Sequence, residues 1–140
     1  MTLWILDTDH ISLYQRGYLT VIEQVISKDP QDLAVTIISI EEQMYGRLNE
    51  IKRASPSNSL VSAYSRLEVT VDYYKSIQIL SFDQNAQVCF EELMRQKILD
   101  GIQDLRIAAI ALSVNGIVVT RNHKDFGKVP NLQLENWATD

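Results

Sequence analysis

The chain has 140 residues, of which 46% are hydrophobic and 22% are charged, and its formal net charge is −5. These values are ordinary for a globular protein, so we expect a single domain over residues 1–140, and they exclude a disordered chain or a coiled-coil rod. The single cysteine excludes an internal disulfide framework and a multi-cysteine metal site. Because the chain is acidic, a nucleic-acid partner would require local basic patches or metal ions.

The sequence carries no signal for a membrane. No apolar run approaches the ~20 residues that span a bilayer. The first ten residues, MTLWILDTDH, lack a basic region and reach Asp7 before the core of a signal peptide could form. We therefore expect a cytoplasmic protein with no membrane partner.

Short apolar segments that predict buried strands alternate with segments of helical periodicity. Residues 3–6 form a continuous apolar run that ends at Asp7, and residues 33–39 form a second, β-branched run. Helical spacing of apolar residues extends over residues 11–26 between the two runs and over residues 41–53 after the second. The first half of the chain thus predicts the order strand, helix, strand, helix.

The second half continues this alternation. A loop is predicted at residues 55–59, and it precedes the clearest helix, over residues 60–74. The remaining elements are a strand over residues 77–80, a helix capped by Asp83, a helix that Asp104 opens and Asn115-Gly116 ends, and strands over residues 117–120 and 132–134. This order predicts a three-layer α/β domain with a central, mostly parallel sheet flanked by helices.

Polar side chains cluster where function collects in such a sheet, at the carboxyl ends of strands and the starts of helices. These side chains are Asp7 and Asp9, Glu41 and Glu42, Asp104, and Arg121 and Asn122 with Asp125 behind. A single carboxylate at a helix start is often only a cap. Several carboxylates brought together repel one another unless a cation neutralises them, and oxygen ligands suit Mg²⁺ or Mn²⁺.

Four motifs, spread over almost the whole chain, carry a family resemblance. They are LDTDHIS, ISIEEQMYG, DLRIAAIAL and VVTRNHKDFGKVPNL, with ENW following the last. In this order they resemble PIN-domain proteins, specifically the VapC-type toxin ribonucleases of bacterial toxin–antitoxin pairs. The resemblance implies a PIN-like fold, a Mg²⁺-dependent ribonuclease in which Mn²⁺ can substitute, an RNA substrate, a cognate antitoxin as partner, and a homodimer.

The motifs also imply a set of catalytic residues. Asp7, Glu42 and Asp104 match the first three acidic positions of the family, and Glu42 is chosen over its neighbour because it stands three residues before Tyr-Gly. The fourth position is Asn122, where some relatives have aspartate, and Asp125 is expected to compensate. Asp7 and Asp104 would bind the metal ion, which would activate a water for attack on the phosphodiester.

Other polar residues near these motifs are candidates for contact with the substrate. Thr8 and Arg121 are the first candidates, and a basic cluster further along is a candidate RNA patch. This cluster consists of Arg47, Lys52 and Arg53. His10 and His123 flank the expected site and are either substrate contacts or ordinary polar positions.

Two other functions remain open. The first is a PIN module that binds a protein or RNA without cutting it, which Asn122 and the acidic balance allow. The second is a phosphatase of the haloacid-dehalogenase type, because Asp7 and Asp9 form a D-x-D pattern after a strand. Ile11 stands where that class has threonine or valine, which weighs against it.

Overall fold

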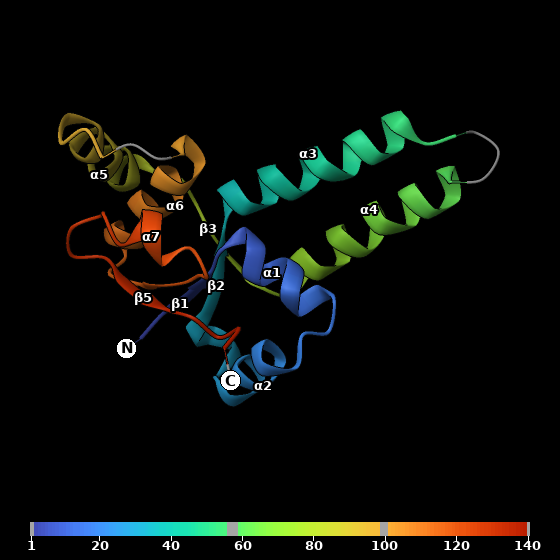
Figure 1. Ribbon diagram of the computed structural model, residues 1–140, viewed down its shortest axis with the longest axis horizontal. Coiled ribbons are helices and arrows are strands. Elements are labelled where there is room, and N and C mark those ends of the chain that lie inside the picture. Colours follow the sequence, from blue (N-terminus) through green and yellow to red (C-terminus); the bar gives the residue numbers. More distant parts are fainter. Residues whose placement is uncertain (1, 56–58, 99–100, 140) are drawn as a thin grey trace.

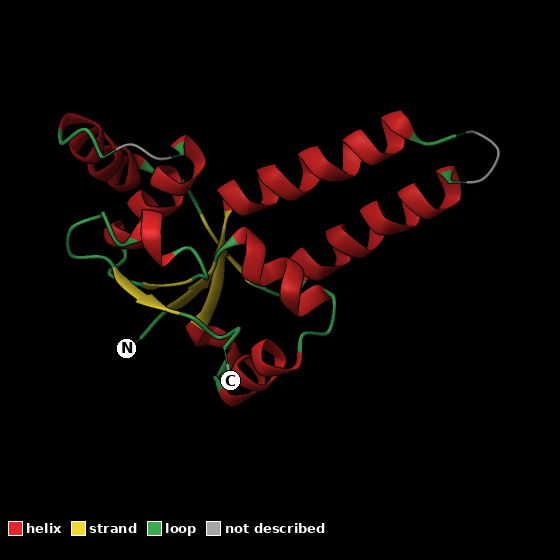
Figure 2. Cartoon of the chain, in the orientation of Figure 1, coloured by secondary structure: helices red, strands yellow, loops and turns green. Residues whose placement is uncertain are grey.

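The computed structural model describes residues 2–55, 59–98 and 101–139, and within them five strands form one sheet. All four strand pairings are parallel, and the strand order is β3-β2-β1-β4-β5 (Figures 1 and 2). The strands are β1 (Trp4–Leu6), β2 (Leu33–Thr36), β3 (Gln78–Leu80), β4 (Ile117–Val119) and β5 (Gln133–Glu135). The sheet confirms the predicted α/β class, and all of its described strands are parallel.

Helices cover both faces of this sheet. They are α1 (Thr8–Gln15), α2 (Leu19–Ser27), α3 (Ile37–Arg53), α4 (Leu60–Lys75), α5 (Gln84–Arg95), α6 (Ile102–Ser113) and α7 (His123–Phe126), with a short 3₁₀ helix over Pro30–Asp32. Adjacent strand residues point to opposite faces. Ile5 therefore packs with the α5–α6 core, whereas Leu6 packs with α1, α2 and Tyr74 of α4. These two cores produce the predicted three layers.

Two predicted boundaries are wrong. The helix expected over residues 11–26 is two helices, because Gly17 adopts a left-handed φ of 83° and the chain turns there. The strand expected over residues 33–39 ends at Thr36, whose hydroxyl accepts a hydrogen bond from the Ser39 N–H and caps α3. Glu42 consequently lies in the second turn of α3 instead of opening the helix.

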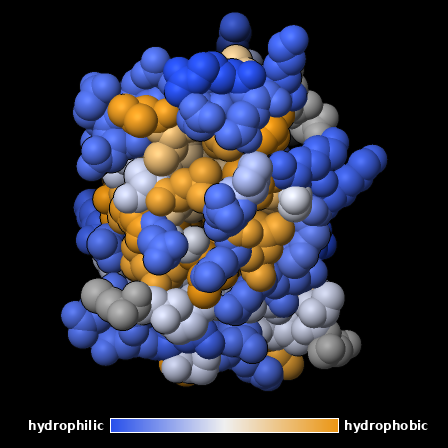
Figure 3. Space-filling view, turned by 90° about the vertical axis from the view of Figure 1, so that its left-hand side faces the viewer, coloured by the Kyte–Doolittle hydropathy of each residue, from blue (hydrophilic) through white to orange (hydrophobic). Residues whose placement is uncertain are grey.

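The long helices α3 and α4 run beside one another and extend away from the sheet (Figure 1). The predicted loop between them, at residues 55–59, lies partly outside the described residues. On the opposite side of the molecule, which carries α5 and β5, hydrophobic residues gather within a hydrophilic surround (Figure 3). No helix in the described part of the chain is long and apolar enough to cross a membrane.

Candidate active site

Asp7 occupies the point where the central strand passes into the first helix. Its backbone N–H donates to the Val119 carbonyl of β4 at 3.0 Å, which extends the sheet by one residue. Its side chain is the N-cap of α1 and accepts a hydrogen bond from the His10 N–H at 2.8 Å. Asp7 is only 6% exposed, so this carboxylate is held in one orientation by both strand and helix.

His10 is fully buried behind Asp7 and is therefore withdrawn from the surface where a substrate would lie. Its Nε2 accepts a hydrogen bond from the Trp137 N–H at 3.2 Å. Because Nε2 is the acceptor, we assign the ring proton to Nδ1. Nδ1 lies 3.3 Å from Oδ1 of Asp7 and makes no well-aligned hydrogen bond within the described chain. The buried imidazole ring of His10 thus packs against the Asp7 carboxylate on the side away from the surface.

Thr8 connects the first helix to α3. Its hydroxyl donates to Oε1 of Glu42 at 2.6 Å and also lies 2.9 Å from the hydroxyl of Ser39. The neighbouring carboxylate, Glu41, is exposed and instead accepts from the Gln103 amide at 2.9 Å. Of the two adjacent glutamates, Glu42 is therefore the one tied to the residue that follows Asp7.

Asn122 joins the remaining two carboxylates. Its Nδ2 donates to Asp104 at 3.2 Å and to Asp125 at 3.0 Å. Asp104 lies in the first turn of α6, two residues after the helix begins, and Asp125 lies in α7. Both aspartates line one small cavity. A neutral amide that donates to both reduces their mutual repulsion, which a fifth carboxylate here could not do.

The carboxylates of the site act on one another electrostatically. The pKa of Asp104 is raised from 3.8 to about 6, first by burial and then by the negative charges of Glu42, Asp7 and Asp125. The Asn122 hydrogen bond acts in the opposite direction. Repelling oxygen ligands of this kind suit a hard divalent cation, so the residues present fit a Mg²⁺ or Mn²⁺ ion.

A second acidic grouping adjoins the first. Ligand atoms of Asp7, Asp9 and His10 lie within 4.8 Å of one another. Asp9, however, forms a two-pronged ion pair with Arg121, at 2.7 and 2.8 Å, and the hydrogen bond from Arg121 lowers the pKa of Asp9. We favour the cluster around Asp104 as the cation site, because no ion pair is formed by Glu42, Asp104 or Asp125 among the described residues, whereas Arg121 already neutralises Asp9.

The predicted basic cluster is not a cluster in the fold. Lys52 and Arg53 lie in the last turn of α3, whereas Arg47 turns toward α4, where its Nε donates to Thr70 at 3.0 Å. Two arginines that the sequence analysis did not select, Arg16 and Arg66, line the same surface cavity as Arg47. Their wide separation along the chain leaves no motif that could have identified them.

A parallel sheet of this order, with carboxylates converging at the end of its central strand, is the arrangement of a PIN-type nuclease. No family model matches the sequence. Ribonuclease VapC2 of Rickettsia felis is 31% identical over 105 residues, which cover 75% of this chain and 74% of that protein. The chain belongs to the VapC ribonuclease family.

Solved structures agree with this fold. VapBC2 from Rickettsia felis, bound to a DNA fragment from its promoter, has a chain 24% identical, with a TM-score of 0.71 over 97% of this chain and 99% of that one. DNA-bound VapBC from Salmonella typhimurium has a chain 23% identical, with a TM-score of 0.77 over 98% of this chain and 99% of that one. The fold class predicted from the sequence is therefore confirmed.

Proposed function

We propose that this chain is a Mg²⁺-dependent endoribonuclease and acts as the toxin of a toxin–antitoxin pair. The observation that carries the proposal is the gathering of carboxylates beyond the central strand, where Asp7 caps α1 and Asn122 joins Asp104 to Asp125, since such a charge cluster calls for a divalent cation. Membership of the VapC family supports the choice of RNA as substrate. The VapBC complexes among the solved relatives support an antitoxin as partner, and a toxin that acts on RNA is expected to work in the cytoplasm.

In this mechanism Asp7 and Asp104 would hold the ion. When bound, the ion would neutralise charge on the scissile phosphate and lower the pKa of a water, Mn²⁺ being a substitute for Mg²⁺. Glu42 and Asp125 orient the attacking water and accept its proton. Attack by water, and not by the ribose 2′-hydroxyl, would form the new P–O bond while the bond to the 3′-oxygen breaks and that oxygen takes up a proton. The products would then carry the 5′-phosphate and 3′-hydroxyl ends that the family resemblance implies.

The hydrogen bonds around the carboxylates keep them ready for this role. The buried His10 and the first turn of α1 fix Asp7, and Thr8 fixes Glu42. Asn122 fixes the positions of the Asp104 and Asp125 carboxylates relative to one another. Carboxylates positioned before the substrate arrives need little reorganisation during the reaction.

The test is cleavage of RNA by purified protein with Mg²⁺, with Mn²⁺ and with EDTA, followed by analysis of the product ends. The matched control is Asp7→Asn, which keeps the shape of the side chain and removes one negative charge. We expect cleavage with either metal, none with EDTA, and a loss of at least about a hundredfold in Asp7→Asn. Full activity in EDTA, or in Asp7→Asn at saturating Mg²⁺, would contradict the mechanism.

A second candidate function is a PIN module that binds RNA or protein without cutting. Asn122 favours it, because an amide stands where some relatives carry an acidic residue. The same assay separates the two functions: a binding module would retain RNA without producing new ends under any metal condition.

A further inference from the structure

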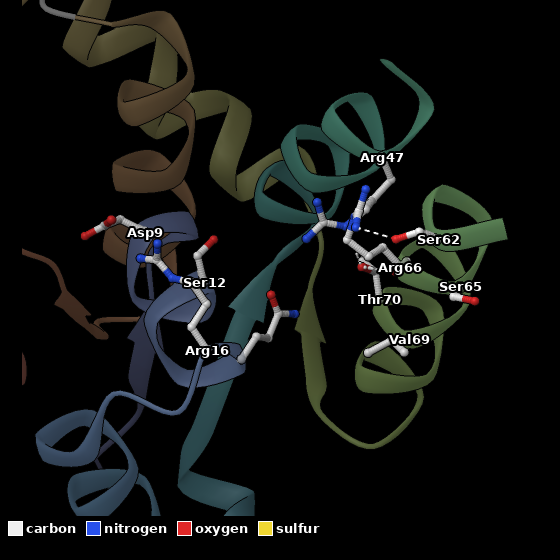
Figure 4. A pocket seen from close by; sticks show the side chains of 10 residues that line it. Asp9, Ser12, Arg16, Arg47, Ser62, Ser65, Arg66, Val69 and Thr70 are labelled. Carbon is white, nitrogen blue, oxygen red and sulfur yellow. Dashed lines mark hydrogen bonds between the residues drawn. The ribbon is translucent and has the colours of Figure 1, made fainter. Parts of the chain in front are cut away.

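An open cavity of ≈ 620 Å³ lies beside the candidate active site, between α1 on one side and α3 and α4 on the other (Figure 4). Asp9, Ser12 and Arg16 line it from α1. Arg47 of α3 and Arg66 of α4 line the facing wall. We call this cavity the arginine groove. Among its described lining residues three are arginines and one is an acid, although the whole chain has a net charge of −5.

The two arginines on the far wall are held in place by one shared acid. Nη1 of Arg47 lies 2.8 Å from Glu50, and Nε of Arg66 lies 2.7 Å from the other oxygen of the same carboxylate. The hydrogen bond from Arg66 is the main cause of the lowered pKa of Glu50. One negative charge shared between two guanidinium groups leaves a net positive charge, and it fixes both groups before a ligand arrives.

Besides the arginines, Asp9 and the Gln15 amide, the polar side chains that line the groove carry hydroxyl groups. Ser62 accepts from Nη1 of Arg66 at 2.8 Å, and Thr70 accepts from Nε of Arg47 at 3.0 Å. Ser12 and Ser65 also line the groove. Arginine forks interleaved with serine and threonine hydroxyls are the side chains that bind the phosphate and sugar oxygens of a nucleic acid.

The groove adjoins the carboxylate site at Asp9. Asp9 lines the groove, and its carboxylate lies within 4.8 Å of the ligand atoms of Asp7 and His10. Figure 4 shows Arg16 reaching from α1 toward Asp9, and the positive charge of Arg16 contributes to the lowered pKa of that acid. An RNA strand that leaves the carboxylate site past Asp9 would thus meet Arg16 and then the far wall of the groove.

We propose that the arginine groove binds the phosphate backbone of single-stranded RNA on one side of the scissile bond. This inference rests on the proposed function and assigns that function its substrate path. Three arginines gathered in one groove of an acidic protein attract a polyanion to that groove. A groove that tracks phosphates with arginines binds single strands with little preference for sequence.

The experiment measures equilibrium binding of a fluorescent twelve-nucleotide polyuridine RNA to the full chain in EDTA, at several salt concentrations. The test variant is Arg16→Gln with Arg66→Gln, because both side chains are exposed and exposed ion pairs contribute little to folding. The matched control is Arg95→Gln, which removes an exposed arginine that pairs with Glu92 on α5, away from the groove. Circular dichroism checks that all variants are folded.

We expect the double variant to bind RNA about tenfold more weakly, with the salt-dependence slope reduced by about 1.4, which corresponds to two lost phosphate contacts on a single strand. Arg95→Gln should match the wild type in affinity and slope. If the double variant binds RNA as tightly as the wild type, the groove assignment is wrong; cleavage of RNA by the wild type would still support the proposed function. If the wild type binds RNA through the groove but does not cleave it, only the proposed function is contradicted. A wild type that neither binds nor cleaves RNA would contradict both.

A poly-glutamate peptide provides a second arm, because an acidic protein segment is the other polyanion that could enter the groove. We expect the peptide to bind more weakly than RNA, since it lacks the tetrahedral phosphates that arginine forks match. If the double variant lost affinity for the peptide while RNA binding stayed unchanged, the groove would belong to a protein partner and the RNA assignment would be wrong.

Discussion

Asn122 donates one hydrogen of its side-chain amide to each of two carboxylates, and this double contact makes its replacement informative. Asn122→Asp removes both donors and adds a negative charge beside Asp104 and Asp125. We expect the metal-free variant to be less stable than the wild type and to bind Mn²⁺ more tightly, with cleavage retained or increased. Thermal melts with and without Mn²⁺, together with calorimetry, measure these effects. Loss of cleavage despite tighter Mn²⁺ binding would show that the amide itself contacts the substrate.

The raised pKa of Asp104 makes the stability of the metal-free protein depend on pH. Its folded value of about 6 lies above the ordinary value of 3.8, so the folded state holds this proton more tightly than the unfolded chain does. The contribution of Asp104 to stability is therefore greatest below the ordinary value and is lost as the pH rises through about 6. We expect Asp104→Asn to raise the melting temperature of the metal-free protein at pH 7.5 and to change it little at pH 4.

Saturating Mg²⁺ is the control for this experiment. It should stabilise the wild type at pH 7.5, because the ion neutralises the cluster, and should stabilise Asp104→Asn much less. Equal stabilisation of both proteins by Mg²⁺ would remove Asp104 from the proposed metal site.

Sequence reasoning reached the carboxylates of the candidate site but not what supports them. Asp7 and Asp104 could be selected because each stands at a strand end or a helix start, and the choice of Glu42 over its neighbour needed the family motif. The contact between His10 and the Trp137 backbone joins residues 127 positions apart, and a backbone N–H carries no side-chain signature. Only the folded arrangement reveals it.

At the scale of elements, the order of strands and helices was predictable because apolar runs and helical periodicity differ clearly along this chain. The boundary between β2 and α3 was not predictable, because Ile37 and Ile38 continue the β-branched run of the strand. Thr36 decides the boundary by capping the helix, and a threonine within such a run fits a strand equally well. The break at Gly17 was missed for a similar reason, because apolar spacing alone does not reveal a left-handed turn.

Two glycines, one directly before β4 and one inside α3, should respond in opposite ways to replacement by alanine. A Cβ at Gly116 would lie 2.7 Å from Cδ1 of the fully buried Ile5, whereas a Cβ at Gly46, inside α3, would meet nothing within 4 Å. We expect Gly116→Ala to destabilise the protein by about 1–3 kcal/mol. Gly46→Ala should stabilise it by about 0.5–1 kcal/mol, because alanine favours the helix. Urea unfolding measures both changes, and a Gly116→Ala protein as stable as the wild type would contradict the close approach of Ile5.

At the scale of the whole molecule, the outer face of α4 exposes apolar side chains. Val61 is 82% exposed, Tyr64 54% and Val71 40%, and all three line one open surface hollow. An apolar face of this kind typically contacts another protein. We expect the chain to form a homodimer through α4, and Val61→Asp with Tyr64→Asp to dissociate it, as light scattering would measure.

Val88→Asp is the comparison for the dimer experiment, because Val88 is 56% exposed on α5, at the other end of the molecule. This variant should remain dimeric. Dissociation by Val88→Asp but not by the α4 changes would move the interface to the α5 surface, and a wild type that is monomeric at high concentration would contradict the dimer altogether.

The central position of β1 has a consequence for synthesis of the protein. The strand that leads into Asp7 is synthesised before one of its two neighbours in the sheet, β4, which begins at residue 117. Asp104, Asn122 and the Trp137 N–H that His10 binds are also synthesised after it. We therefore expect a nascent chain to complete its carboxylate cluster only after Asn122 and Asp125 have left the ribosome.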